Sequence, residues 1–158
     1  MNHHSTHPIR GFTLIELMVT LSVLVILLTI AVPSFRVFVQ AQRVKTTSFD
    51  LFSAITYARS EALKRNGDVS LSAATGGWGN GWSISVGGTT LRSQAALDTS
   101  VAITASATTL TYGRDGRITG SAATTLQLAA NPSVSSITPR CITIDLSGRP
   151  NSKLGSCA

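Results

Sequence analysis

The sequence predicts an α+β protein in which one long N-terminal helix packs on a C-terminal antiparallel β-sheet head. Three observations support this fold class. The 158 residues contain an apolar run at residues 12–32, a stretch without Gly or Pro at residues 34–66, and short β-branched segments after Gly67. We therefore expect three parts: residues 1–11, a long helix over residues 12–66, and a β-rich head over residues 67–158.

The first element is the apolar run FTLIELMVTLSVLVILLTIAV, in which Glu16 is the only charged residue. About 20 apolar residues suffice to cross a bilayer as a helix. A buried core helix is an alternative, but such helices are rarely apolar on every side. A secretory signal is another, but it has a shorter apolar core and a better cleavage site than Ala31-Val32-Pro33. The run therefore predicts a transmembrane helix.

The second half of the predicted helix carries one apolar stripe that would pack on the head. Its members recur at helical spacing: Val44, Leu51, Ile55, Ala58 and Ala62. Glu61 and Arg65 are placed as an i,i+4 ion pair. Asn66-Gly67 is a stop signal for the helix.

After Gly67 the sequence predicts short strands separated by turn clusters rich in Gly and Asn. The predicted strands are Val69–Ala73, Trp82–Val86, Val101–Thr104, Thr108–Tyr112, Thr125–Ala129 and Cys141–Leu146. The regular alternation in the last of these argues against a disordered Ser/Thr-rich linker. The spacing indicates an antiparallel sheet folded against the helix.

A specific motif, GFTLIE, stands at residues 11–16, where a polar leader meets the apolar run. It resembles the signal of type IV prepilins and type II secretion pseudopilins. The resemblance implies that residues 1–11 are a prepilin leader, which prepilin peptidase removes by cutting between Gly11 and Phe12. The same enzyme would methylate the new amino terminus of Phe12. Because pilins commonly carry a proline after the apolar run, the helix should continue through Pro33 with a kink.

Glu16 would be the fifth residue of the mature chain. A carboxylate inside a membrane segment costs a few kcal/mol, so a partner is expected. The resemblance implies that Glu16 pairs with the amino terminus of a neighbouring subunit during assembly. The alternative is a carboxylate that reaches water at the membrane surface, and its position alone favours neither.

Further segments resemble the FimT/FimU and GspH branch of minor pilins. They are YARSEA at residues 57–62, VSL at residues 69–71 and WGNGW at residues 78–82. With the leader motif, the resemblance covers about residues 11–86, and the final segment matches again. It implies a pilin-like fold and a subunit that starts the filament or forms its tip. We expect Trp78 and Trp82 to pack in the core; the alternative is a stacking platform for nucleic acid.

The sequence argues against an enzyme. The three histidines, His3, His4 and His7, lie in the leader, so the mature chain would lack His-based catalysis and the usual zinc ligand sets. The sequence has neither a P-loop nor a dinucleotide-binding glycine motif. Asp98, Asp115 and Asp145 stand far apart with no motif around them. We expect no catalytic residue, metal or cofactor.

Cys141 and Cys157 are the only cysteines. The implied topology places the head outside the cytoplasm, where a disulfide can form. We predict a bond between them that ties the last loop to the final strand; metal binding and a catalytic thiol are weaker alternatives. Closing such a loop contributes roughly 3 kcal/mol in the chain-entropy model.

Basic residues in the head are candidates for DNA binding. Some FimT-like minor pilins bind DNA through a C-terminal Gly-Arg-x-Arg motif; here Gly148-Arg149-Pro150 is followed by Asn151, and Lys153 comes two residues later. Exposed Arg and Lys can contact phosphates without reading sequence. The candidates are Arg149, Lys153, Arg140, Arg114 and Arg117. The alternative is that Arg149 follows a turn glycine and faces solvent, and the net charge of +6 is a weak indication of an acidic partner.

The leading hypothesis is a minor pilin of a type IV pilus, which primes filament assembly or forms its tip. Its partners would be other major and minor pilins, contacted through the N-terminal helix. Before assembly it would span the bacterial inner membrane once, with its head in the periplasm. One alternative is a DNA-binding minor pilin that takes up double-stranded DNA in natural transformation. Another is a minor pseudopilin of type II secretion, which the neighbouring genes would distinguish.

Overall fold

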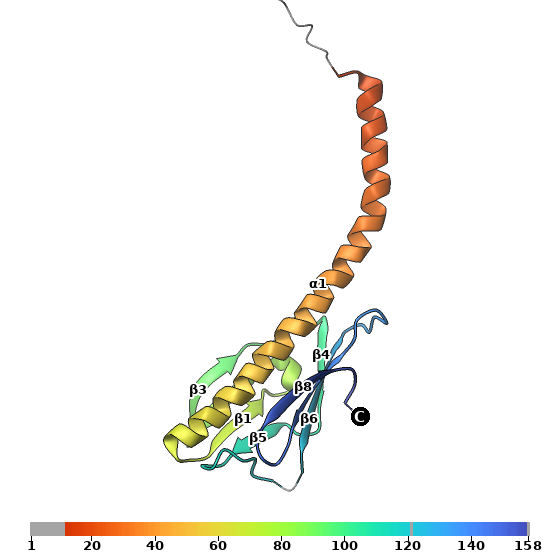
Figure 1. The fold of residues 1–158 in the computed structure, drawn as a ribbon. Helices are drawn as coiled ribbons and strands as arrows, with labels where there is room; N and C mark the ends of the chain where they lie inside the picture. The colour runs from red at the N-terminus through yellow and green to blue at the C-terminus, as the bar shows by residue number, and fades with distance from the viewer. Residues whose placement is uncertain (1–11, 121, 158) are drawn as a thin grey trace, which may run out of the picture. The chain divides into compact units, whose positions relative to one another are not determined.

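The computed structural model describes residues 12–120 and 122–157 (Figure 1). The leader, with Gly11 and the three histidines, lies outside these residues. The cleavage site is therefore only half described, from Phe12 onward. The described chain divides between Arg36 and Val37 into a helical unit and a head unit.

One helix, α1 (Leu14–Arg65), runs through both units and continues past Pro33, as expected. It ends where the sequence predicts. Asn66 adopts a φ of 51°, in the left-handed region, and the N–H of Gly67 donates to the carbonyl of Ala62 at 3.2 Å. This cap satisfies a carbonyl that the helix end leaves without an intrahelical partner.

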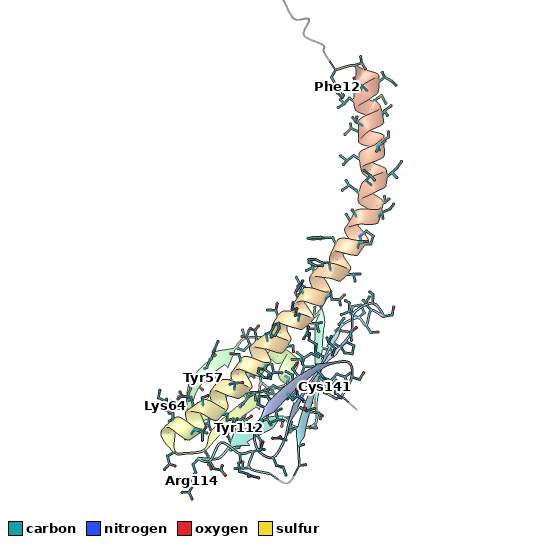
Figure 2. The ribbon with its side chains drawn as sticks, in the orientation of Figure 1. Phe12, Tyr57, Lys64, Tyr112, Arg114 and Cys141 are labelled. Carbon is teal, nitrogen blue, oxygen red and sulfur yellow. A yellow bond between two sulfur atoms is a disulfide. The ribbon has the colours of Figure 1, made fainter. Side chains whose placement is uncertain are left out.

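The apolar part of α1 is bare. Every residue from Phe12 to Arg36 is exposed, and its apolar side chains project on all sides (Figure 2). A core helix of a soluble protein would be mostly buried, so the buried-helix alternative is wrong. By length and composition, this part of α1 is sufficient to cross a membrane.

The second half of α1 has one buried face, and the predicted stripe is confirmed. Its five members are each at most 1% exposed: Val44, Leu51, Ile55, Ala58 and Ala62. Glu61 lies beside them, and its carboxylate accepts a hydrogen bond from Arg65 at 2.6 Å. The predicted i,i+4 pair is therefore confirmed, and its hydrogen bond holds the pKa of Glu61 below its usual value.

The head contains two four-stranded antiparallel sheets, where the sequence suggested one. In the first, with the order β3-β2-β1-β5, the strands are β1 (Val69–Ala73), β2 (Trp82–Val86), β3 (Thr89–Gln94) and β5 (Thr109–Tyr112). In the second, with the order β4-β6-β7-β8, they are β4 (Val101–Ala105), β6 (Thr124–Ala130), β7 (Arg140–Ile144) and β8 (Pro150–Leu154). A short 3₁₀ helix, η1 (Trp78–Asn80), lies between β1 and β2.

Sequence patterning missed β3 and β8. Both are edge strands, so most of their residues are exposed and neither carries the apolar alternation that marks a half-buried strand. In β8, Pro150 also argued against a strand, although proline is tolerated at an edge. The segment expected to be a loop between the cysteines therefore contains the edge strand β8.

The two sheets and the buried face of α1 share one core. Strand β6 shows the required alternation, since Thr124, Leu126, Leu128 and Ala130 are buried and the residues between them are not. Trp78 and Trp82 are 3% and 4% exposed, and the indole N–H of Trp78 donates to the carbonyl of Ala107 at 2.9 Å. The tryptophans are core residues, and the stacking-platform alternative is wrong.

Truncation of the stripe should destabilise the head. Leu51 is fully buried, so Leu51→Ala should lower the free energy of unfolding by about 2–5 kcal/mol, the cost of a cavity. Leu146 is 39% exposed, and Leu146→Ala should cost roughly 1 kcal/mol or less. Denaturant unfolding, followed by the fluorescence of Trp78 and Trp82, measures both, and equal losses would contradict the assignment of the core face.

Candidate functional site

Glu16 lies in the first turn of α1, and its backbone N–H donates to the hydroxyl of Thr13 at 3.3 Å. Thr13 and Glu16 thus stand three residues apart, as in a capping box at a helix start. Among the described residues, no ion pair involves the Glu16 carboxylate. Glu16 is therefore an exposed acid without an ion pair in the otherwise apolar segment 12–32.

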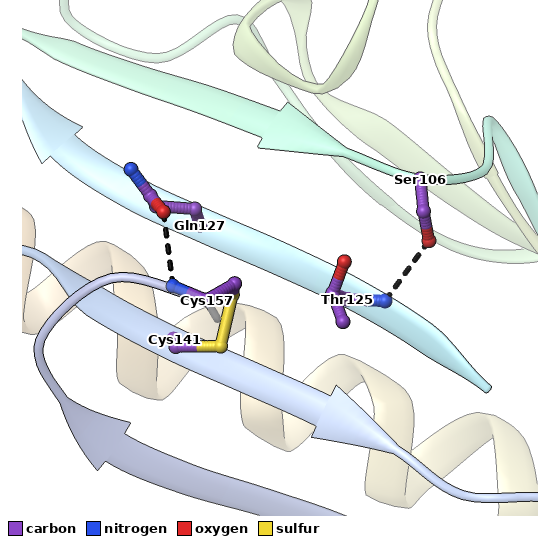
Figure 3. Close-up of a disulfide and its surroundings, with 5 residues drawn as sticks. All are labelled: Ser106, Thr125, Gln127, Cys141 and Cys157. Atoms are coloured by element: carbon purple, nitrogen blue, oxygen red, sulfur yellow. Dashed lines mark hydrogen bonds between the residues drawn. A yellow bond between two sulfur atoms is a disulfide. The ribbon is translucent and has the colours of Figure 1, made fainter.

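The predicted disulfide between Cys141 and Cys157 is confirmed, with an S–S distance of 2.04 Å. Cys141 lies in β7 and Cys157 follows β8. The N–H of Cys157 also donates to the side-chain carbonyl of Gln127 in β6 at 3.0 Å (Figure 3). The bond was expected to tie a loop to the final strand; it joins the segment after the final strand to the neighbouring strand β7, because residues 150–154 form β8.

Two glycine–arginine turns shape one end of the head. In the first, the N–H of Gly113 donates to the carbonyl of Arg117, and the carboxylate of Asp115 accepts from the N–H of Arg117 at 3.1 Å. In the second, Gly148 has a φ of +76°, and the N–H of Arg149 donates to the carboxylate of Asp145 at 3.2 Å. In each turn an aspartate fixes the backbone of the arginine that follows the glycine.

The two turns are packed against each other. A Cβ on Gly148 would lie 2.2 Å from the carbonyl oxygen of Gly116, so only glycine fits there. Arg59 of α1 donates to the carbonyls of Gly116 at 2.9 Å and Ser147 at 3.4 Å. The hydroxyl of Tyr112 donates to the carbonyl of Gly148 at 3.2 Å, and burial raises the pKa of this phenol.

This packing brings three of the five candidate DNA-binding residues together. Arg114 and Arg117 belong to the first turn and Arg149 to the second, and all three side chains are exposed. The hydroxyl of Ser147 and the N–H of Arg149 hold the pKa of Asp145 below its usual value, so this carboxylate remains charged at neutral pH. The arginines therefore form a positive cluster that Asp115 and Asp145 partly offset.

The other two candidates lie elsewhere. Lys153 pairs with Cys141 across β7 and β8, whereas Arg140 pairs with Leu154. Successive residues of a strand point to opposite faces, so Arg140 and Lys153 lie on opposite faces of the sheet. Arg140 points toward α1, where its guanidinium lies 5.7 Å from the centre of the Phe49 ring. The five residues thus do not share one face.

Two family models match the chain. The prokaryotic N-terminal methylation motif matches residues 7–32, and the type II transport protein GspH model matches residues 49–148. The second match spans more than half of the sequence. The chain belongs to the GspH family. Its members are minor pilins and pseudopilins, and no curated protein matches the chain significantly.

Solved structures share the fold of this GspH-family chain. The type IV minor pilin FimU of Pseudomonas aeruginosa is 22% identical, with a TM-score of 0.65; the match covers 73% of this chain and 92% of FimU. The minor pseudopilin EpsH of the Vibrio cholerae type 2 secretion system is 11% identical, with a TM-score of 0.56; the match covers 71% of this chain and 97% of EpsH. Both support the pilin-like α+β fold.

Sequence patterning missed the residues that join the two turns of this GspH-family head, namely Arg59, Tyr112 and Gly148. Their contacts link positions far apart in the chain, and no local spacing reports them. The sequence signal was the recurrence of Gly followed by Arg, at residues 113–114, 116–117 and 148–149.

Gly148→Ala should separate these turns. The Cβ clashes with Gly116 and the φ is positive, so we expect a loss of stability of about 2–4 kcal/mol. Gly88 is the matched control, since it also has a positive φ but no atom within 4 Å of an added Cβ. Gly88→Ala should cost only about 1 kcal/mol of backbone strain. Equal losses in denaturant unfolding would contradict the close packing of the turns.

Proposed function

We propose that this chain is a minor pilin of a type IV pilus that primes filament assembly or forms its tip. The observation that carries the proposal is the exposed apolar segment of α1, which lies within the match to the methylation motif. Apolar side chains exposed on every side of a helix are unstable in water and need lipid or other helices around them. A subunit that moves from membrane to filament meets this need in both places.

In the proposed cycle, prepilin peptidase removes residues 1–11 and methylates Phe12. The apolar helix then holds the subunit in the inner membrane, with the head in the periplasm, until it joins a filament. Lipid and neighbouring pilin helices provide similar apolar contacts, so entry into the filament requires a specific polar interaction as well. We propose that Glu16 provides it by pairing with the ammonium group of a neighbouring subunit.

Glu16→Ala and Glu16→Gln should both reduce incorporation. Either change leaves an ammonium group unpaired among apolar helices, which costs roughly 2–3 kcal/mol, and we expect at least about tenfold less subunit in sheared filaments. Glutamine can still accept a hydrogen bond at the helix start, so it tests the charge specifically. Normal incorporation of Glu16→Gln, with processing verified by mass spectrometry, would rule out the ion pair.

The pseudopilin alternative is supported by the GspH family model and by the fold shared with EpsH. The pilus assignment is supported by the fold shared with FimU. Deletion of the gene distinguishes the two, because a pilus subunit should change the number of surface pili while a pseudopilin should change the amount of secreted protein.

DNA uptake is a second candidate function, favoured by the arginine cluster of the two glycine–arginine turns. Arg114, Arg117 and Arg149 are exposed at one end of the head and could contact phosphates. The missing second arginine after Gly148-Arg149 and the two nearby aspartates weaken this candidate.

If the cluster binds DNA, the full-length chain in detergent micelles should bind a fluorescent duplex weakly, with an affinity that falls steeply with salt. Arg117→Ala combined with Arg149→Ala should lower the slope of log affinity against log salt by about 2. Arg140→Gln is the control, since Arg140 faces α1. If the fluorescence anisotropy of the duplex does not change when the chain is added at low salt, DNA binding is ruled out.

A further inference from the structure

The edge of β8 is open. Strands β7 and β8 pair with Arg140 opposite Leu154, and the N–H of Gly155 donates to the carbonyl of Pro139 at 2.8 Å. In an antiparallel ladder this bond makes Arg140 and Leu154 a non-hydrogen-bonded pair. The backbone groups of Leu154, Ser152 and Pro150 therefore point away from β7. Among the described residues nothing bonds to them.

The open edge can pair with another strand. It offers the N–H groups of Ser152 and Leu154 as donors, and the carbonyls of Pro150, Ser152 and Leu154 as acceptors. Pro150 has no N–H, so pairing would start at Ser152. Beyond β8, the disulfide holds the chain over β7 on the face of Cys141, which leaves the edge uncovered (Figure 3).

The edges of β5 and β3 are less regular than that of β8. The carbonyl of Thr111 in β5 accepts bonds from Thr119, and Tyr112 forms a bridge with Ile118. The register of β3 against β2 is interrupted between Ile84 and Ser85. Irregularities and covering segments of this kind are how proteins prevent unwanted pairing at a sheet edge.

A groove of about 200 Å³ lies where β8 ends and α1 passes. Its apolar lining includes Val44, Ile137 and Leu154, and Leu154 is 66% exposed. Lys45 of α1 and Arg140 of β7 also line it. The ion pairs of the described residues join Arg43 to Asp98 and join Lys64 and Arg65 to Glu61, so neither cation of the groove has an acidic partner.

We propose that an extended acidic–apolar segment of a partner protein adds to β8 and fills this groove. Main-chain bonds to Ser152 and Leu154 would fix the segment. Side chains on the face toward α1 recur at every second residue of a strand. An apolar side chain would therefore enter the groove, and a carboxylate two residues away would meet Lys45 and Arg140. This surface lies wholly in the head, so it holds for a pilus or a secretion subunit alike.

A peptide is favoured over DNA as the occupant. The groove combines apolar side chains with two cations, and the outward N–H and carbonyl groups of β8 beside it match a peptide backbone. The exposed arginines of the glycine–arginine turns are a separate group, because Arg140 faces α1. DNA binding at the groove is an outcome that the experiment can detect.

The test uses the full-length chain in detergent micelles, labelled with ¹⁵N, at about 0.15 M salt, where distant charges are screened. The probe is an octapeptide that repeats threonine-valine-threonine-glutamate, which places valine and glutamate alternately on one face. It should shift the amide signals of Ser152 and Leu154 and slow their hydrogen exchange. The matched peptide with lysine in place of glutamate should do neither.

Variants locate the contact. Lys45→Gln and Arg140→Gln should each weaken binding roughly two- to fivefold, the effect of one exposed ion pair. Leu154→Pro removes an outward N–H and should abolish binding without breaking a bond to β7. Lys153→Gln, on the opposite face of β8, is the control and should leave the affinity unchanged.

Three results would overturn the proposal. The first is the absence of any change at Ser152 and Leu154. The second is a failed control: either the lysine peptide binds as tightly as the glutamate peptide, or Lys153→Gln weakens binding as much as Lys45→Gln does. The third is displacement of the glutamate peptide by duplex DNA whose binding depends on Lys45, which would assign the groove to nucleic acid.

Discussion

Burial of one face of α1 is the interaction on which the head depends. The stripe from Val44 to Ala62 belongs to the same core as the inner residues of both sheets. Leu51, Ile55, Ala58 and Ala62 have no exposed surface, so this face of the helix is fully packed within that core. The helix therefore serves as the common layer that holds the two sheets in one head.

Before Val37 the described residues of the same helix are all exposed to solvent. From Val37 onward one face of the helix is buried in the head, whereas the apolar side chains of residues 12–32 are exposed on every side. The exposed apolar segment must be covered by lipid or by other helices. Glu16 stands near its start, and an unpaired charge in such surroundings is costly.

The basic residues of the head fall into two groups, those with partners inside the chain and those without an ion pair. Arg43, Lys64 and Arg65 have acidic partners, and Arg59 holds the two glycine–arginine turns together. Among the described residues, the exposed arginines of these turns and the cations of the groove beside β8 form no ion pair. They lie at different places, so a polyanion and an acidic peptide would not compete for the same residues.

The sequence by itself determined the long helix, its bare apolar part, its buried stripe, its stop at Asn66-Gly67 and the cysteine pair. These features follow from local periodicity and residue type, which act over neighbouring positions. Only the tertiary structure decided the division into two sheets, the edge strands β3 and β8, the contact between Gly116 and Gly148, and the opposite faces of Arg140 and Lys153. Strands β3 and β8 lack apolar alternation because most of their residues are exposed to solvent. Contacts between distant turns depend on how the strands pair, which no local pattern records.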